Sequence, residues 1–150
     1  MPLLSIEHFR QEETAGCLAA CVQMALTHMG HAVSQRELNR LFELTSIGIP
    51  WPRIERLTQL NVQVRLESGA ERELQQAINH NQPPIIFLRT GELTSYWHAD
   101  LQHAVLLVGY DAQYVFLNDP AFPAAPQQAT WGELMLAMIE YDYAYALITP

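Results

Sequence analysis

Two apolar runs joined by a short polar turn constrain the fold of this chain more than any other feature. The first run covers residues 103–110 (HAVLLVGY), and the second, residues 114–119 (YVFLND), begins after the turn at residues 111–113. Apolar runs of this length bounded by turn residues are typical of buried strands, and such close spacing favours an antiparallel hairpin. The pattern therefore predicts an antiparallel sheet, with His103 at the start of one strand and Asp119 at the end of its partner.

Helical segments come before this hairpin, and most of them begin with a recognisable cap. Residues 15–29 (AGCLAACVQMALTHM) predict an apolar helix with Thr14 as N-cap and Gly30 at its end. Two capping boxes and one first-turn proline predict three more helices: Ser34-x-x-Glu37 for a helix to Leu44, Pro52 for one to about Leu60, and Ser68-x-x-Glu71 for one to about His80.

The remaining segments complete an α+β pattern. Strands are expected at residues 62–66 (VQVRL), 85–89 (IIFLR) and 143–149 (YAYALIT), and Thr130-x-x-Glu133 opens a further helix to about Glu140. No internal repeat, low-complexity tract or linker divides the 150 residues, of which 49% are hydrophobic. The sequence predicts one α+β domain over residues 1–150, with N-terminal helices packed on a C-terminal antiparallel sheet.

Charge and hydropathy exclude several classes of protein. The net charge is −8, and the eight basic residues are scattered arginines, so no basic patch is available for nucleic acid. No apolar run is long enough to cross a bilayer, and the N-terminal MPLLSIEHFRQEET lacks the features of a secretory signal. We expect a cytoplasmic protein; the oligomeric state is left open.

The two cysteines, Cys17 and Cys21, lie one helical turn apart. A helix directs their side chains in parallel, which disfavours a disulfide between them. A zinc site needs about four ligands, and the sequence has no second cysteine pair and no His-x-x-x-His, so no metal or other cofactor is expected. We expect Cys21 to be a core residue. Cys17, in the first turn, faces the positive end of the helix dipole, which favours a thiolate and makes it a candidate nucleophile.

A nucleophilic thiolate needs a base and an orienting group from elsewhere in the chain. His103 and Asp119 meet this need if the hairpin forms, because the carboxylate then returns beside the imidazole. Gln11, shortly before Cys17, is a candidate oxyanion donor. Two alternatives remain open: Asn118 as the orienting group, and His98 as a rival base, although a loop position makes His98 more suitable for lining a substrate cleft. Tyr96 and Trp97, in the same loop, are the other candidate substrate-binding residues. Trp51 is a further aromatic residue that could form a wall of a peptide groove.

These motifs, taken in order, resemble the bacteriocin-processing, double-glycine-type cysteine peptidases of the papain-like superfamily. The resemblance is carried by Gln11, CLAACVQMALTHMG, HAVLLVGYD and LNDP, and it spans nearly the whole chain. It implies a papain-like fold, a peptide or protein substrate with small residues before the cut, and Cys17, His103, Asp119 and Gln11 as nucleophile, general base and acid, orienting group and oxyanion donor.

Two departures from the family pattern affect what the resemblance implies. Leu18 stands where many relatives have a glycine after the nucleophile, and residues 1–150 include none of the membrane domains to which the best-known members are fused. The expected function is hydrolysis of peptides through a thioester by a stand-alone peptidase domain. An acyltransferase using the same thioester and a non-catalytic peptide-binding module are the alternatives.

Overall fold

The computed structural model describes residues 2–150 and contains one six-stranded antiparallel sheet in the order β1-β6-β2-β3-β4-β5. The strands are β1 (Gln63–Ser68), β2 (Ile85–Arg89), β3 (Gln102–Tyr110), β4 (Tyr114–Asn118), β5 (Gln127–Thr130) and β6 (Ala144–Thr149). The helices are α1 (Cys17–His28), α2 (Gln35–Phe42), α3 (Glu71–Asn79) and α4 (Trp131–Met138), with 3₁₀ segments η1 (Trp51–Leu60), η2 (Thr90–Glu92) and η3 (Ile139–Tyr141). The predicted α+β class is confirmed.

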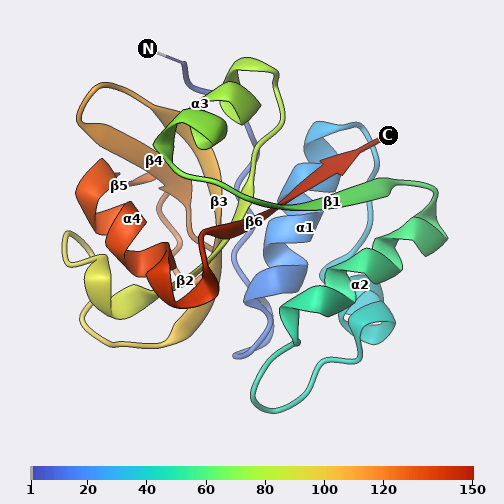
Figure 1. Cartoon of the computed structure of the whole chain (residues 1–150). Helices are drawn as coiled ribbons and strands as arrows, with labels where there is room; N and C mark the ends of the chain where they lie inside the picture. The colour runs from blue at the N-terminus through green and yellow to red at the C-terminus, as the bar shows by residue number, and fades with distance from the viewer. Residues whose placement is uncertain (1) are drawn as a thin grey trace.

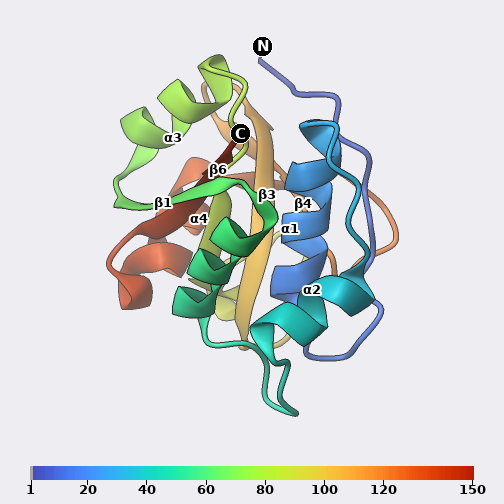
Figure 2. The same ribbon diagram turned by 90° about the vertical axis from the view of Figure 1, so that its right-hand side faces the viewer.

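The sheet lies between two layers of helices. Figure 1 shows α4 and α3 in front of the sheet, and Figure 2 shows α1 and α2 on the opposite side of it. The two layers enclose separate apolar clusters, one built around α1, α2 and η1 and the other around α3 and α4. The N-terminal helices therefore cover one face, as expected, and the later helices cover the other. No helix within residues 2–150 is long and apolar enough to span a bilayer.

The apolar run of strand β2 is explained by its burial on both faces. Successive side chains of a strand point to opposite faces. Ile85 and Phe87 belong to the cluster under α1, whereas Ile86 and Leu88 belong to the cluster under α4. Since both faces are covered, both sets of side chains are apolar.

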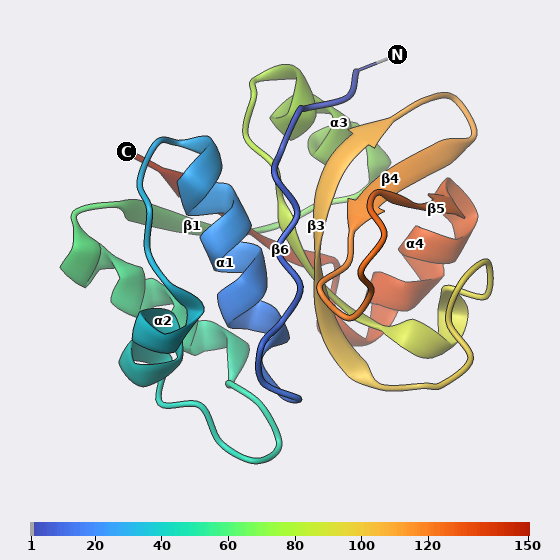
Figure 3. The same cartoon turned by 180° about the vertical axis from the view of Figure 1, so that it is seen from behind.

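The predicted hairpin is confirmed. β3 and β4 pair antiparallel, with Leu106 opposite Asn118 and a bulge between Leu107 and Gly109. The N-terminal segment, residues 2–11, runs along β3 at the bulge: the Leu4 N–H donates to the Val108 carbonyl at 2.7 Å, and the Tyr110 N–H donates to the Pro2 carbonyl at 3.0 Å. Figure 3 shows this segment passing between α1 and the β3–β4 hairpin on its way to the first helix.

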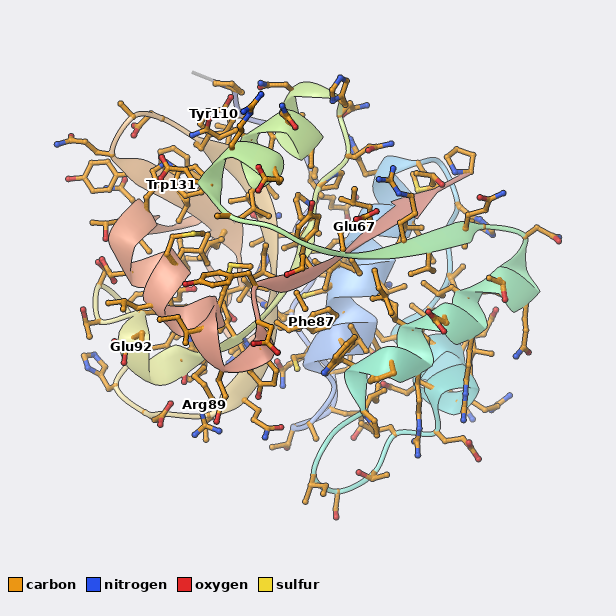
Figure 4. The ribbon with its side chains drawn as sticks, viewed as in Figure 1. Glu67, Phe87, Arg89, Glu92, Tyr110 and Trp131 are labelled. Carbon is orange, nitrogen blue, oxygen red and sulfur yellow. The ribbon has the colours of Figure 1, made fainter. Side chains whose placement is uncertain are left out.

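The predicted caps are confirmed for two helices. The Ser34 hydroxyl accepts from the Glu37 N–H at 3.1 Å at the start of α2, and Thr130 and Glu133 form a complete capping box at the start of α4. At the start of α4, Trp131 also donates its indole N–H to the Asp111 carbonyl at 2.9 Å, which connects this helix to the hairpin turn. Figure 4 shows Trp131 and Tyr110 together at this end of the sheet.

Two local predictions were wrong, and one strand was missed. The N-cap of α1 is Gly16, which offers no side chain, and not Thr14. The N-cap of α3 is Ala70, whose N–H donates to the Glu73 carboxylate at 3.1 Å. Ser68 is instead the last residue of β1, and its hydroxyl donates to the Asp142 carbonyl. Strand β5, a short polar segment (QQAT), was not predicted at all.

Candidate active site

Cys17 is the first residue of α1, and its thiol is partly exposed. Its backbone N–H belongs to the first turn, whose N–H groups have no carbonyl partner within the helix. The turn before the helix is tight: the Gly16 N–H donates to the Glu13 carbonyl at 3.0 Å, and a Cβ on Gly16 would lie 3.2 Å from that oxygen. A small residue at this position lets the chain turn directly into the helix that begins with Cys17.

His103, near the start of β3, contacts Asp119 and lines the same cavity as Cys17. Its Nε2 lies 2.7 Å from Asp119 Oδ1. Burial of the ring opposes its protonation, but the hydrogen bond to Asp119 and the nearby Cys17 outweigh burial and raise the pKa of His103 to about 9. The geometry therefore favours an imidazolium next to the sulfur at neutral pH.

Asp119 is fully buried, yet four groups satisfy its carboxylate. Burial opposes the charged form, but hydrogen bonds from His103, the Ala121 N–H and the Trp97 indole hold the pKa of Asp119 below its usual value. Oδ1 accepts from His103 and from the Ala121 N–H at 3.0 Å. Oδ2 accepts from the Tyr96 hydroxyl at 2.9 Å and from the Trp97 indole at 2.8 Å. Burying a carboxylate is expensive unless it is paired and hydrogen-bonded in this way.

The structure brings Asp119, and not Asn118, to the imidazole. Asn118 is the last residue of β4, and its side-chain amide donates to the Ile6 carbonyl at 3.3 Å, on the N-terminal segment. Asn118 therefore anchors that segment, and the alternative that it orients His103 has no support from the geometry.

Gln11 lines the same cavity as Cys17 and His103. Its backbone N–H donates to the Pro120 carbonyl at 2.8 Å, directly after Asp119. Its side-chain amide donates to the carbonyls of Thr14 and Glu13, at 2.7 and 3.1 Å. Both hydrogens of the amide are thus engaged within the turn that precedes Cys17.

A cavity of about 570 Å³ opens beside Cys17. Apart from His103, its lining contains no ionisable side chain except the Cys17 thiol and the phenol of Tyr141. Its apolar walls include Leu18, Ile47, Ile49, Trp51, Phe87 and Leu101. Phe87, which Figure 4 shows near the middle of the molecule, packs on Trp51 with ring centroids 5.2 Å apart. Apart from His103, the site thus offers an uncharged, largely apolar surface next to the thiol.

The three candidate substrate-binding residues have different positions. Trp97 lines the cavity, and its ring lies edge-on to His103 with centroids 5.2 Å apart. Tyr96 does not line the cavity, because its hydroxyl donates a hydrogen bond to Asp119 and its ring packs on Phe122. His98 is exposed and also lies outside the lining. Only Trp97 is therefore placed to meet a substrate, and the placement of Tyr96 and His98 argues against that role.

The second cysteine is separate from this chemistry. Cys21 is fully buried in the cluster under α1, and burial, together with the nearby Cys17 and Asp119, raises the pKa of its thiol well above the usual value. Both cysteines are free. Among residues 2–150, no three His, Cys, Asp or Glu side chains are grouped so that they could hold a metal ion.

Comparison with known proteins defines the class. The model of the Peptidase_C39 like family matches residues 3–146, and the chain belongs to this family. Its fold is that of the papain-like C39 peptidase domains, as the resemblance implied. Family and fold together support a role in peptide processing. No curated protein shows significant sequence similarity to the chain.

Three solved structures illustrate the fold. A protein described as a C39-like peptidase from Bacillus anthracis superposes with a TM-score of 0.79 at 14% identity, covering 99% of this chain and 97% of that one. The peptidase domain of Streptococcus ComA, a bifunctional ABC transporter of a quorum-sensing pathway, gives 0.77 at 16% identity, covering 96% and 98%. A double-glycine motif protease from an AMS/PCAT transporter, in complex with a leader peptide, gives 0.76 at 16% identity, covering 99% and 94%.

Proposed function

We propose that this protein is a cysteine peptidase in which Cys17 is the nucleophile, His103 the general base and acid, and Asp119 the group that orients His103. The observation that carries the proposal is the buried hydrogen bond of 2.7 Å between His103 and Asp119, with Cys17 lining the same cavity as His103. A nucleophile, a base and an orienting carboxylate gathered at one site are what acyl transfer requires. Residues 1–150 then act as one peptidase domain.

The reaction follows from these contacts. His103 takes the proton of the Cys17 thiol, and the sulfur attacks the carbonyl carbon of a peptide bond. The tetrahedral oxyanion accepts hydrogen bonds from the Cys17 N–H and the Gln11 amide. His103 then protonates the departing amine, which leaves a thioester on Cys17. Finally, His103 removes a proton from water, which attacks the thioester and releases the acid.

The oxyanion role of Gln11 requires one exchange of hydrogen bonds. Its amide donates to two carbonyls of the preceding turn, and the bond to the Glu13 carbonyl, at 3.1 Å, is the longer one. We infer that the substrate oxygen replaces this carbonyl as acceptor, since the two acceptors have the same chemistry and the Glu13 carbonyl also accepts from the Gly16 N–H.

The substrate proposed is a peptide or protein segment that is uncharged around the scissile bond. The support is the apolar lining of the cavity beside Cys17 and the leader peptide bound by the similar double-glycine motif protease. Small residues before the cut are the expectation from the family resemblance, and a peptide library tests it directly.

The test compares thiol reactivity with turnover. Cys17 is expected to react with iodoacetamide at slightly acidic pH, where an ordinary thiol is protonated, while buried Cys21 stays unlabelled. Peptide-library hydrolysis, followed by mass spectrometry, is expected for the wild type and absent for Cys17→Ala. Transfer of the acyl group to added amines in preference to water indicates an acyltransferase. A wild type that binds peptides, cleaves none and shows no labelling of Cys17 would contradict the enzyme and leave a binding module.

A further inference from the structure

A buried glutamine on α2 contacts the chain on both sides of Gln11. Gln35 is the first residue of α2 and is only 1% exposed. Its Oε1 accepts from the Glu12 N–H at 2.9 Å, and its Nε2 donates to the Arg10 carbonyl, also at 2.9 Å. These two peptide groups flank Gln11, so one side-chain amide holds the backbone at both ends of this residue.

The same amide also connects Gln11 to the helix of the nucleophile. The second hydrogen of Gln35 Nε2 is donated to Gln23 Oε1 at 2.9 Å, and Gln23 lies on α1, the helix that begins with Cys17. On its other side, the Gln11 N–H donates to the Pro120 carbonyl, next to Asp119. The backbone of Gln11 is therefore fixed relative to both α1 and the Asp119 loop.

An amide suits this position because of its donors and acceptor. Holding a carbonyl and an N–H of neighbouring peptide groups while also reaching Gln23 needs one acceptor and two donors, which a glutamine side chain provides. An apolar side chain of the same size would leave the Glu12 N–H and Arg10 carbonyl without this partner. Because oxyanion donors act only when their position is held to a fraction of an ångström, small displacements of Gln11 have large effects on rate.

We propose that Gln35 is a positioning residue that holds the oxyanion donor Gln11 in register with Cys17, an inference that rests on the proposed peptidase function. Gln35 itself touches no substrate: its side chain is buried and does not line the cavity. Gln35 affects catalysis only by holding Gln11 in place. Its hydrogen bond to Gln23 fixes it relative to α1.

The test is a double-mutant cycle between Gln35→Met and Gln11→Ala, with kcat/KM for peptide hydrolysis as readout. In the wild-type background, Gln35→Met is expected to lower kcat/KM by about tenfold to a hundredfold. In the Gln11→Ala background, it is expected to cause little further loss, since the residue through which it acts is already absent. Independent, multiplying losses would overturn the proposal.

Alkylation of Cys17 separates this role from a general loss of structure. Iodoacetamide reacts with the thiolate without forming an oxyanion, so its rate depends on Cys17 and His103 but not on Gln11. Gln35→Met is expected to alkylate at the wild-type rate while hydrolysing peptide slowly. A parallel fall of both rates would mean that Gln35 merely supports the fold. Ile78→Ala, a core truncation in α3 on the other face of the sheet, is the control for stability and is expected to change neither rate below its melting temperature.

Gln23→Met keeps the test decisive if Gln35→Met does not fold. It removes the link to α1 but leaves both backbone contacts of Gln35, so a smaller fall in kcat/KM is expected, again only when Gln11 is present. A fall of the same size in the Gln11→Ala background would overturn the proposal. A wild type without turnover refutes the peptidase itself, which is a different result from a peptidase indifferent to Gln35.

Discussion

His103 is the residue whose charge state decides what the site can do. Its side chain is 6% exposed, and burial by itself would keep the ring neutral. The carboxylate of Asp119, at 2.7 Å, and the Cys17 thiol reverse that preference. In the proposed mechanism, the imidazolium form is then available at neutral pH to protonate a leaving amine.

The first expectation concerns pH. Because the pKa of His103 is raised to about 9, kcat/KM for peptide hydrolysis should fall as the pH rises through about 9, where the imidazolium is lost. Asp119→Asn removes the charge that raises this pKa, so the alkaline limb should move to lower pH and the maximal rate should drop. Asp100→Asn, at an exposed carboxylate bonded to Arg89, should leave the limb in place. An unchanged limb in Asp119→Asn would contradict the assignment.

The second expectation concerns the buried carboxylate. Tyr96→Phe removes one of the two donors to Asp119 Oδ2, and hydrogen bonds to charged groups contribute about 1.5–3 kcal/mol, so a loss of this order in unfolding free energy is expected. Tyr110→Phe removes a hydroxyl that donates to Asn79 at 2.8 Å in an exposed setting, and it should cost less. Equal losses in denaturant titrations of the two variants would argue against the special position of Tyr96.

The residues at element ends were the ones that the sequence allowed us to predict. Cys17, His103 and Asp119 sit at the first turn of a helix and at two strand ends, positions that periodicity and turn signals mark. The contact of Tyr96 and Trp97 with Asp119 could not be predicted, because a loop gives no register. Gln35 was missed for the same kind of reason: it contacts Arg10 and Glu12 from a position more than 20 residues along the chain, and no local pattern records such contacts.

At the scale of elements, helix starts show where local chemistry is decisive and where it is overridden. Thr130 and Glu133 cap α4 reciprocally, and Glu133 also accepts from the Ser95 N–H at 2.9 Å and the Ser95 hydroxyl at 2.6 Å. This carboxylate therefore joins α4 to the loop that carries Tyr96 and Trp97. Thr14, which looked equally suitable as a cap, instead contributes its carbonyl to Gln11, and the turn through Gly16 starts the helix.

Paired substitutions test this difference. Thr130→Ala should lower the unfolding free energy by about 1 kcal/mol, the usual cost of losing an N-cap, because the Glu133 N–H loses its acceptor. Thr14→Ala should change stability by less than about half of that, since its hydroxyl caps no helix and surface substitutions have small effects. Thermal melts of the two variants under one condition make the comparison. A larger loss of stability for Thr14→Ala than for Thr130→Ala would mean that Thr14 caps α1, as the sequence predicted.

The more deeply a strand is buried, the more closely its bounds could be predicted from the sequence. β2 and β3 are covered on both faces and consist of apolar runs, so their positions could be predicted closely from the sequence. β5 has only four residues, QQAT, with one buried side chain, and it exists because it pairs with β4 at the sheet edge. Its formation depends on a neighbour that no local pattern reveals.

At the scale of the whole molecule, the N-terminal segment connects parts of the chain that are distant in sequence. Residues 2–11 contact the β3–β4 hairpin through Leu4 and the Asp119 loop through Gln11, and His8 adds a hydrogen bond of 2.7 Å to the Phe122 carbonyl. The segment thus positions Gln11 between the hairpin that carries His103 and the helix that carries Cys17. The order of motifs along the chain predicted which residues meet, but not that this segment holds them together.

Gly109 provides the close approach that this arrangement needs. A Cβ there would lie 2.7 Å from both the Pro2 carbonyl oxygen and Leu3 Cδ1, and the backbone oxygen cannot move without displacing the segment. Gly109→Ala should therefore lower the unfolding free energy by about 1–3 kcal/mol, the range for overpacked sites.

Hydrogen exchange locates the effect of this substitution. The Leu4 amide, which donates to Val108 at 2.7 Å, should exchange faster in Gly109→Ala, because the segment is pushed away from the bulge. Gly132→Ala is the matched control: a Cβ there meets only Thr130 Oγ1 at 3.8 Å, and alanine is the better helix former, so stability should rise by up to about 1 kcal/mol. If Gly109→Ala leaves the Leu4 amide protected and the stability unchanged, the N-terminal segment does not depend on close packing at the bulge. A second result is also informative: the Leu4 amide exchanges faster and peptide hydrolysis falls, but Cys17 alkylation stays unchanged. The contact at the bulge then contributes to the position of Gln11 at the other end of the segment.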